Sequence, residues 1–203
     1  MNQIRLALMV AFVTCACGAG QTAVAQANPP LAQTQLTPGE KAAHTLKDTF
    51  SLLSVLEAGF SGSIDQLSDF PVGWGQGGEA YGKRISSRWA RRGIRNGIEL
   101  GLQVPLGIDP RYDVMGGRNI ASRIGHAFRR TLVARRDGAG EMPNIPTFVS
   151  IFGTSAISLQ WYPQRYRTGS HIVGLGAQDL GWEVGNNLFR EFWPDVKRIV
   201  FKR

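Results

Sequence analysis

The stretch from Gly78 to Leu102 constrains the fold of this chain more than any other segment. It reads GEAYGKRISSRWARRGIRNGIELGL. At about 100° per residue on a helix, its small residues gather on one face and its arginines lie nearly opposite. The small residues are Gly78, Gly82, Ser86, Ala90, Gly93, Gly97 and Gly101, and the arginines are Arg84, Arg88, Arg91, Arg92 and Arg95. The pattern predicts a helix that packs closely through its glycines and presents guanidinium groups on its other face.

A second segment repeats the small spacing near the end of the chain. Ala177, Gly181 and Gly185 are four residues apart in a helix expected from about His171 to Trp193, where Pro194 should stop it. We expect this helix to be the partner of the first one, because two small stripes let helix backbones approach closely. The same glycine stripes also offer a route to oligomerisation.

Other segments also indicate helices. Thr37, Pro38 and Glu40 form a capping box before an apolar series that should extend the first helix to about Gly59 or beyond. The helix of the organising stretch should end near Val104-Pro105. A further basic helix is expected from Ile120 to about Arg136, with Asn119 as its cap. No segment shows sustained period-two alternation, so we predict an all-α fold.

The segment from Met142 to Gln164 contains no charged side chain and is the best candidate for a membrane segment after the N-terminus. Its usable helix, 147–162, is at the short limit for a membrane span. A buried central helix is therefore the favoured interpretation. Together with the other helices, it predicts a compact, glycine-rich bundle of about five helices over 37–198, joined by small-xxx-small contacts.

The N-terminus resembles a secretory signal peptide. Arg5 precedes an apolar core, and Ala23-Val24-Ala25 supplies a cleavage site, so 1–25 is expected to be removed. Both cysteines lie inside this segment, which excludes disulfides and thiol chemistry from the mature chain. We expect 26–36 to be a disordered leader and 199–203 a basic tail. The protein is thus expected in the periplasm or elsewhere in the cell envelope.

Charge favours anionic partners. The 203-residue chain has a formal net charge of +8, and most of that charge is arginine. We expect an anionic membrane surface or wall polymer to bind the arginine faces of the two basic helices. No nucleic acid is expected, because helical spacing points Trp89 and Phe128 towards the core. The candidate anion-binding residues are Arg84, Arg88, Arg91, Arg92, Arg95, Arg111, Arg123 and Arg130.

Candidate chemistry is sparse. Asp109-Pro110-Arg111-Tyr112 could form an anion clamp, although such a loop is more often structural. A hydrolase using His126 or His171 with Asp109 is an alternative, but no nucleophile elbow accompanies these residues. A zinc site formed by His171, Asp179 and Glu183 is not favoured, because it would have only one histidine ligand. We therefore predict no catalytic residues, no metal and no cofactor.

Several short stretches, taken in order, resemble an uncharacterised family of small exported bacterial envelope proteins. The stretches are Trp74-Gly75-Gln76-Gly77, Tyr81-Gly82-Lys83-Arg84, Asp109-Pro110-Arg111-Tyr112, Arg130-Thr131-Leu132-Val133, Tyr162-Pro163 and Phe192-Trp193-Pro194-Asp195. The resemblance covers about 50–198 and implies export and a helical architecture. It implies no activity.

The leading hypothesis is a non-catalytic exported envelope protein that is attached peripherally through its arginine faces. An integral membrane protein with a tight hairpin of 147–162 and 171–192 is the second hypothesis. The hydrolase is the third. The predicted helix-packing residues are Gly78, Gly82, Gly93, Gly97, Gly101, Gly181 and Gly185.

Overall fold

The structure is a computed structural model that describes residues 35–138 and 140–200. In this part of the chain the fold is all-α, as predicted, but it has six helices rather than about five. The α-helices are α2 (Pro38–Thr49), α3 (Leu52–Leu67), α4 (Gly78–Leu106), α5 (Ile120–Leu132), α6 (Ile145–Ser158) and α7 (Gly169–Val200). The 3-10 turns η1 (Leu159–Trp161) and η2 (Gln164–Tyr166) follow α6, and β1 (Val133–Arg135) pairs with β2 (Glu141–Pro143).

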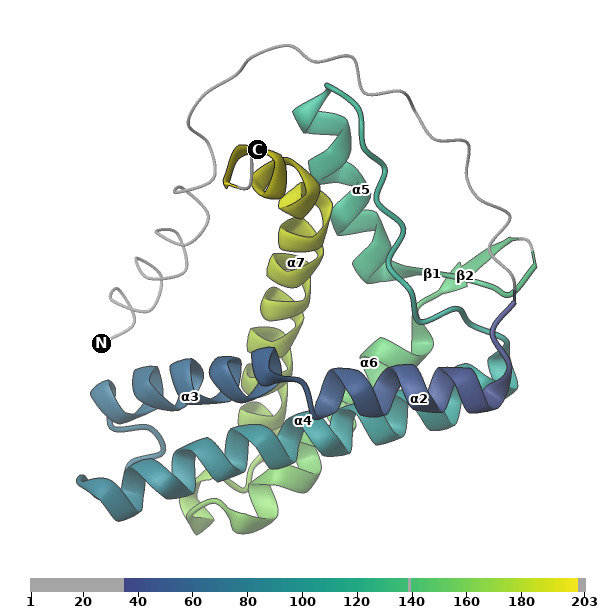
Figure 1. Cartoon of the computed structure of the whole chain (residues 1–203). Coiled ribbons are helices and arrows are strands. Elements are labelled where there is room, and N and C mark those ends of the chain that lie inside the picture. Colours follow the sequence, from purple (N-terminus) through teal and green to yellow (C-terminus); the bar gives the residue numbers. More distant parts are fainter. Residues whose placement is uncertain (1–34, 139, 201–203) are drawn as a thin grey trace.

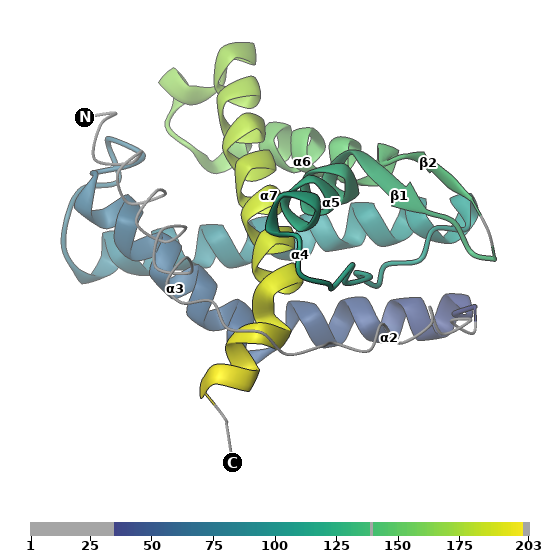
Figure 2. The same ribbon diagram turned by 90° about the horizontal axis from the view of Figure 1, so that it is seen from above.

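Helix α4 is the central element, since α2, α3 and α6 all pack against it. The ribbon shows α2 and α3 end to end along α4, with α6 close by (Figure 1). Helix α7 crosses this layer and packs against both α6 and α5 (Figure 2). The prediction that residues 78–102 form the organising helix is therefore confirmed. The predicted signal peptide and most of the predicted leader lie outside the described residues.

The predicted capping box is confirmed at the start of α2. The Glu40 carboxylate accepts a hydrogen bond from the Thr37 backbone N–H at 2.8 Å, and Thr37 Oγ1 accepts one from the Glu40 N–H. The prediction of one helix to Gly59 is wrong. Ser51 caps a new helix by accepting a hydrogen bond from the Ser54 N–H at 3.1 Å, so α2 and α3 are separate.

Two prolines lie inside helices that they were expected to end. Pro105 is in the last turn of α4, and the helix ends at Leu106 with Gly107 as its cap, at a left-handed φ of 60°. Pro194 lies inside α7, which continues to Val200 and changes direction in its C-terminal part (Figure 1). Helix α5 is shorter than expected because the β-branched Val133 begins β1 instead of a further helical turn.

The interior of the molecule is mostly small and polar. On α3 the buried residues are Ser54, Ala58, Gly62 and Asp65. On α6 they include Thr147, Ser150, Thr154 and Ser158. A compact apolar cluster does form around the loop after α6. It consists of Leu159, Tyr162, Tyr166 and Leu175, with Phe70, Trp74 and Ile172 packed against it.

Large apolar side chains lie on the outside of the same helices. On α3, Leu52 is 76% exposed and Leu67 is 85% exposed. Trp89 on α4 and Phe128 on α5 were predicted to face the core, but both are exposed. No helix in the described part of the chain combines the length and the apolar character that a membrane span requires. As predicted, α6 is a mainly buried helix.

The close helix contacts are not where the glycine stripes predicted them. A Cβ atom built at Gly78, Gly82, Gly93, Gly97, Gly101 or Gly185 would have no atom within 4 Å. A Cβ at Gly62 of α3 would instead lie 2.8 Å from Ile85 Cγ1 and 3.3 Å from the Ile85 backbone nitrogen. One close approach is thus between α3 and α4 at Gly62, and another is between α7 and α6, where a Cβ at Gly176 would clash with the Phe152 ring.

Candidate functional site

The arginines of α4 point into the molecule. Arg84 is fully buried and donates hydrogen bonds to the Phe70 carbonyl at 2.8 Å and to Asp69 at 3.0 Å. Arg88 forms a two-pronged ion pair with Asp65 of α3, at 2.6 and 2.8 Å. Burial opposes the charge of Arg88, but the hydrogen bonds and the charge of Asp65 prevail and raise its pKa.

The other α4 arginines pair with acids from helices on both sides. Arg91 pairs with Asp179 and Arg95 pairs with Glu183 at 2.5 Å, both on α7. Arg92 pairs with Asp48 of α2 at 3.0 Å and with Glu57 of α3. Helices α4 and α7 are therefore joined, as the sequence predicted, but by charged side chains rather than by glycine stripes.

Polar side chains of α7 form a stripe with four-residue spacing, whose first two members pair with arginines of α4 and whose last two pair with Arg123 of α5. Its members are Asp179, Glu183, Asn187, Glu191 and Asp195. Asn187 donates to Thr131 Oγ1 of α5 at 3.0 Å. The stripe explains why α7 lies against two basic helices at once, since each of its turns supplies a hydrogen-bonding partner.

The remaining candidate anion-binding residues are also paired. Arg111 forms a two-pronged pair with Asp109 at 2.9 and 2.7 Å. Arg123 bonds Glu191 at 3.2 Å and Asp195 at 2.6 Å, and Arg130 bonds Asp113 at 2.5 Å. The prediction of exposed arginine faces is therefore wrong, because internal carboxylates already occupy these guanidinium groups.

Glu191 is the centre of the most connected polar cluster. Its carboxylate is fully buried and accepts hydrogen bonds from the Tyr112 hydroxyl at 3.0 Å and from two backbone N–H groups, of Met115 and Gly116, at 3.1 Å. His126 Nδ1 lies 3.2 Å from it. Burial, followed by the charge of Glu191, raises the pKa of Tyr112. The cluster ties the loop after α4 to α5 and α7.

The hydrolase residues are not brought together. His126 contacts Tyr112 and Glu191, His171 contacts Thr168 and the Tyr166 ring, and Asp109 is paired with Arg111. Asp179 and Glu183 are held by arginines instead of facing His171. Within the described residues, no group of three potential metal-ligating side chains occurs.

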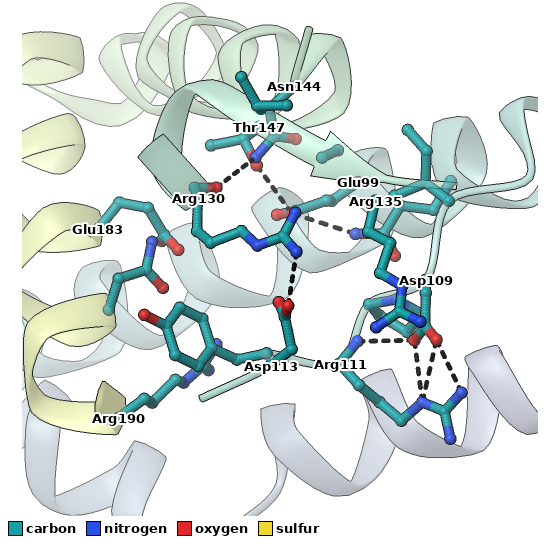
Figure 3. Close-up of a pocket in the computed structure, with 17 residues that line it drawn as sticks. Glu99, Asp109, Arg111, Asp113, Arg130, Arg135, Asn144, Thr147, Glu183 and Arg190 are labelled. Carbon is teal, nitrogen blue, oxygen red and sulfur yellow. Dashed lines mark hydrogen bonds and ion pairs between the residues drawn. The ribbon is translucent and has the colours of Figure 1, made fainter. Parts of the chain in front are cut away.

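A polar cavity of about 90 Å³ lies where five parts of the chain meet (Figure 3). These parts are the end of α4, the loop after it, the α5–β1 junction, the start of α6 and the middle of α7. Its charged lining residues are Glu99, Asp109, Arg111, Asp113, Arg130, Arg135, Glu183 and Arg190. The predicted site residues Arg111 and Arg130 thus meet here, whereas Arg84, Arg88, Arg91, Arg92, Arg95 and Arg123 do not line the cavity.

Charges in the cavity are not fully matched. Glu99 accepts hydrogen bonds from Thr147 Oγ1 at 3.1 Å and Gln103 Nε2 at 3.2 Å, and burial raises its pKa despite the nearby Arg95. In the part of the chain that the structure describes, Arg135 and Arg190 form no ion pair. The Nε atom of Arg130 is buried there without a hydrogen-bond partner.

Sequence reasoning missed Glu99, Glu191, Arg135 and Arg190 as site residues. The four-residue spacing of polar groups along α7 was a usable signal for Glu191. No local signal pointed to Glu99 or Arg135, because their neighbours in the cavity come from distant parts of the chain. Comparisons with protein-family models, with curated proteins and with solved structures found no match to this chain.

Proposed function

We propose that this protein is a non-catalytic protein of the cell envelope that is held on a membrane by its apolar exterior. The observation that carries the proposal is the inverted distribution of side chains. Outside the apolar cluster around Tyr162, the interior is mostly small and polar, and many large apolar residues lie on the outside. Soluble proteins rarely expose extended apolar surface unless it meets a partner or a membrane.

Helix α5 is the clearest example. Its apolar stripe is exposed: Ile120 is 61% exposed, Phe128 49% and Leu132 51%. The buried stripe lies beside it on the helix and consists of Arg123, Ala127 and Thr131. An amphipathic helix in a water-soluble protein turns its apolar stripe to the core. The reverse orientation suits a protein whose surroundings are lipid acyl chains, where polar groups must find partners inside the protein.

Attachment through acyl chains has more support than attachment through lipid headgroups. Binding to lipid headgroups requires cations that are free to contact phosphates. The arginines of α4 and α5 do not meet this requirement, because internal acids already pair with most of them. A deeper insertion through a hairpin of 147–162 and 171–192 has less support, because that part of α7 carries Asp179, Glu183 and Glu191. Export to the envelope rests on the signal-peptide pattern of 1–25.

Membrane fractionation of the full chain tests this proposal. Membranes of expressing cells are washed with high salt, with alkaline carbonate and with a mild detergent, and the protein is followed in pellet and supernatant. We expect it to stay in the pellet after both salt and carbonate and to be released by detergent. Apolar contact is insensitive to ionic strength, whereas headgroup attraction is screened.

Two outcomes would overturn the proposal. Release by salt would show attachment through charge. Recovery in the soluble fraction as an oligomer, measured by sedimentation, would show that a second copy of the chain covers the apolar exterior instead of lipid.

A further inference from the structure

An apolar groove lies directly beside the polar cavity and shares two of its lining residues, Tyr112 and Arg190. The groove has a volume of about 300 Å³. Its other walls come from the loop after α4 and from the C-terminal half of α7. They are Val114, Phe189, Trp193 and Pro194. The two hollows are therefore neighbours on either side of Tyr112 and Arg190, one polar and the other apolar.

The polar end favours a negatively charged group. Arg190 is exposed and, among the described residues, makes no ion pair, and the same is true of Arg135 at a half-buried position. The buried Arg130 Nε–H, which has no acceptor in the described part of the chain, adds a hydrogen-bond donor. A carboxylate or phosphate oxygen supplies the acceptor and the charge that these groups lack.

Neighbouring acids do not cancel this charge. Asp109 is held by Arg111, Asp113 by Arg130, and Glu183 by Arg95. Figure 3 shows the Arg130 side chain reaching towards Asp113 near the centre of the site, and the Arg190 side chain entering from α7. Glu99 lies 3.8 Å from Arg95, which it shares with Glu183, and burial raises the pKa of Glu99 and so favours its neutral form.

The apolar end favours a hydrocarbon chain. Phe189 and Trp193 are one helical turn apart, and their rings are 5.0 Å apart between centroids. With Val114 and Pro194 they give the groove walls that carry few polar atoms. Binding sites for small molecules typically combine such apolar walls with a few polar groups that fix the orientation of the ligand.

We propose that the groove and the cavity together bind one anionic amphiphile. Its acyl chain lies against Val114, Phe189 and Trp193, and its carboxylate or phosphate head meets Arg190 at the mouth of the cavity. The inference goes beyond membrane attachment, because it concerns a single site with charge selectivity. It does not depend on whether the rest of the exterior contacts lipid.

Native mass spectrometry of the purified full chain tests the site. The protein is titrated separately with dodecanoate, dodecanoyl lysophosphatidate, dodecanol and inorganic phosphate. We expect one adduct with dodecanoate or with the lysophosphatidate, and the stronger of the two identifies the head as carboxylate or phosphate. Dodecanol, which lacks the charge, and phosphate, which lacks the chain, should each bind at least tenfold more weakly.

Variants locate the site. Arg190→Gln removes an exposed charge without breaking an ion pair of the described chain, so it should fold and bind the preferred amphiphile at least tenfold more weakly. Arg198→Gln, on the same helix but outside both hollows, is the matched control and should bind as the wild type does. Val114→Asp should also weaken binding, because it places a charge beside the acyl chain.

Equal binding by Arg190→Gln and wild type would overturn the proposal, and so would equal binding of dodecanol and dodecanoate. Binding of inorganic phosphate alone at full strength would reduce the site to one for a small anion and would also overturn it. Membrane fractionation of the same variants distinguishes ligand binding from membrane attachment. Arg190→Gln should lose ligand binding but remain in the membrane pellet.

Discussion

The arginines of α4 are stabilised by their pairing, because an isolated buried charge is costly to desolvate. Arg88 and Asp65 are both nearly buried, so neither is tolerable without the other. Truncating one partner of such a pair is far more damaging than replacing both. At the scale of residues, this protein is built from matched charges that hold helices at fixed positions.

Glu99 is an exception among the buried charges, because burial disfavours its charged form, and it leads to a prediction about pH. Its folded-state pKa is raised above the ordinary glutamate value, so its contribution to stability is complete below about pH 4 and is lost as pH rises through the folded pKa. Wild-type protein therefore carries a penalty at neutral pH that the neutral amide of Glu99→Gln avoids. We expect Glu99→Gln to have a higher Tm than wild type at neutral pH, and the two to converge below about pH 4.

Glu183→Gln is the matched control for this measurement. Glu183 pairs with Arg95 at 2.5 Å, so its loss should lower the Tm at neutral pH. If Glu99→Gln lowered the Tm as much as Glu183→Gln does, Glu99 would be a stabilising charged partner and the prediction would be wrong.

At the scale of elements, α3 and α5 each bury a narrow stripe of small or polar residues and expose several large apolar side chains. Helix α3 buries Ser54, Ala58 and Gly62 at four-residue spacing and exposes Leu56 and Phe60. Small side chains allow α3 to approach the α4 backbone closely at Gly62. The contact between α3 and α4 therefore rests on close approach of the two backbones rather than on burial of bulky side chains.

Glycine substitutions distinguish the two kinds of stripe. Gly97→Ala lies on the open face of α4 and should stabilise the fold by about 0.5–1 kcal/mol, because alanine is the better helix former. Gly62→Ala should destabilise it by about 1–3 kcal/mol, because the added methyl would meet Ile85 at 2.8 Å. Thermal unfolding of both variants under one set of conditions measures the difference. A loss of stability in Gly97→Ala would instead place the α4 glycine stripe in a contact, for instance with a second copy.

At the scale of the whole molecule, the apolar exterior extends over α3, α5 and α6, which are separate segments of the chain. The polar interior satisfies nearly all of its own hydrogen bonds. Within the described residues only four buried side-chain atoms have no partner: Arg92 Nε, Arg130 Nε, Asp137 Oδ1 and Thr154 Oγ1. A molecule with this distribution needs surroundings that cover apolar surface.

Substitutions in the exposed apolar stripe of α5 test whether the apolar exterior contacts lipid. Ile124→Gln/Phe128→Gln should lower partition into neutral vesicles at least tenfold while the helix content stays unchanged, because each side chain gives about 1.5–3 kcal/mol when fully buried in an apolar phase. Ser122→Gln, which changes an exposed polar residue on the side of the helix away from Ile124 and Phe128, is the control and should partition as the wild type does. Unchanged partition of the Ile124 and Phe128 variant would exclude the α5 stripe as a membrane contact.

Local features of the fold were predictable from the sequence. The Thr37 capping box, the Asn119 cap and the start of α4 were all found where expected, because each depends on residues within one or two helical turns. The continuation of α7 through Pro194 was not predictable, because proline ordinarily ends a helix. The break at Ser51 was missed although its cap is local, because the apolar series continues across it.

The sequence by itself determined an all-α fold, the position of its central helix and two opposed faces on that helix, because periodicity is a local property. Only the tertiary structure decided which face is inside. The partners of Arg88 and Arg91 are 23 and 88 residues away in the chain, so no local pattern could pair them. Once those acids neutralise the arginines, the arginine face can be buried, and the glycines and large apolar residues are left to the exterior.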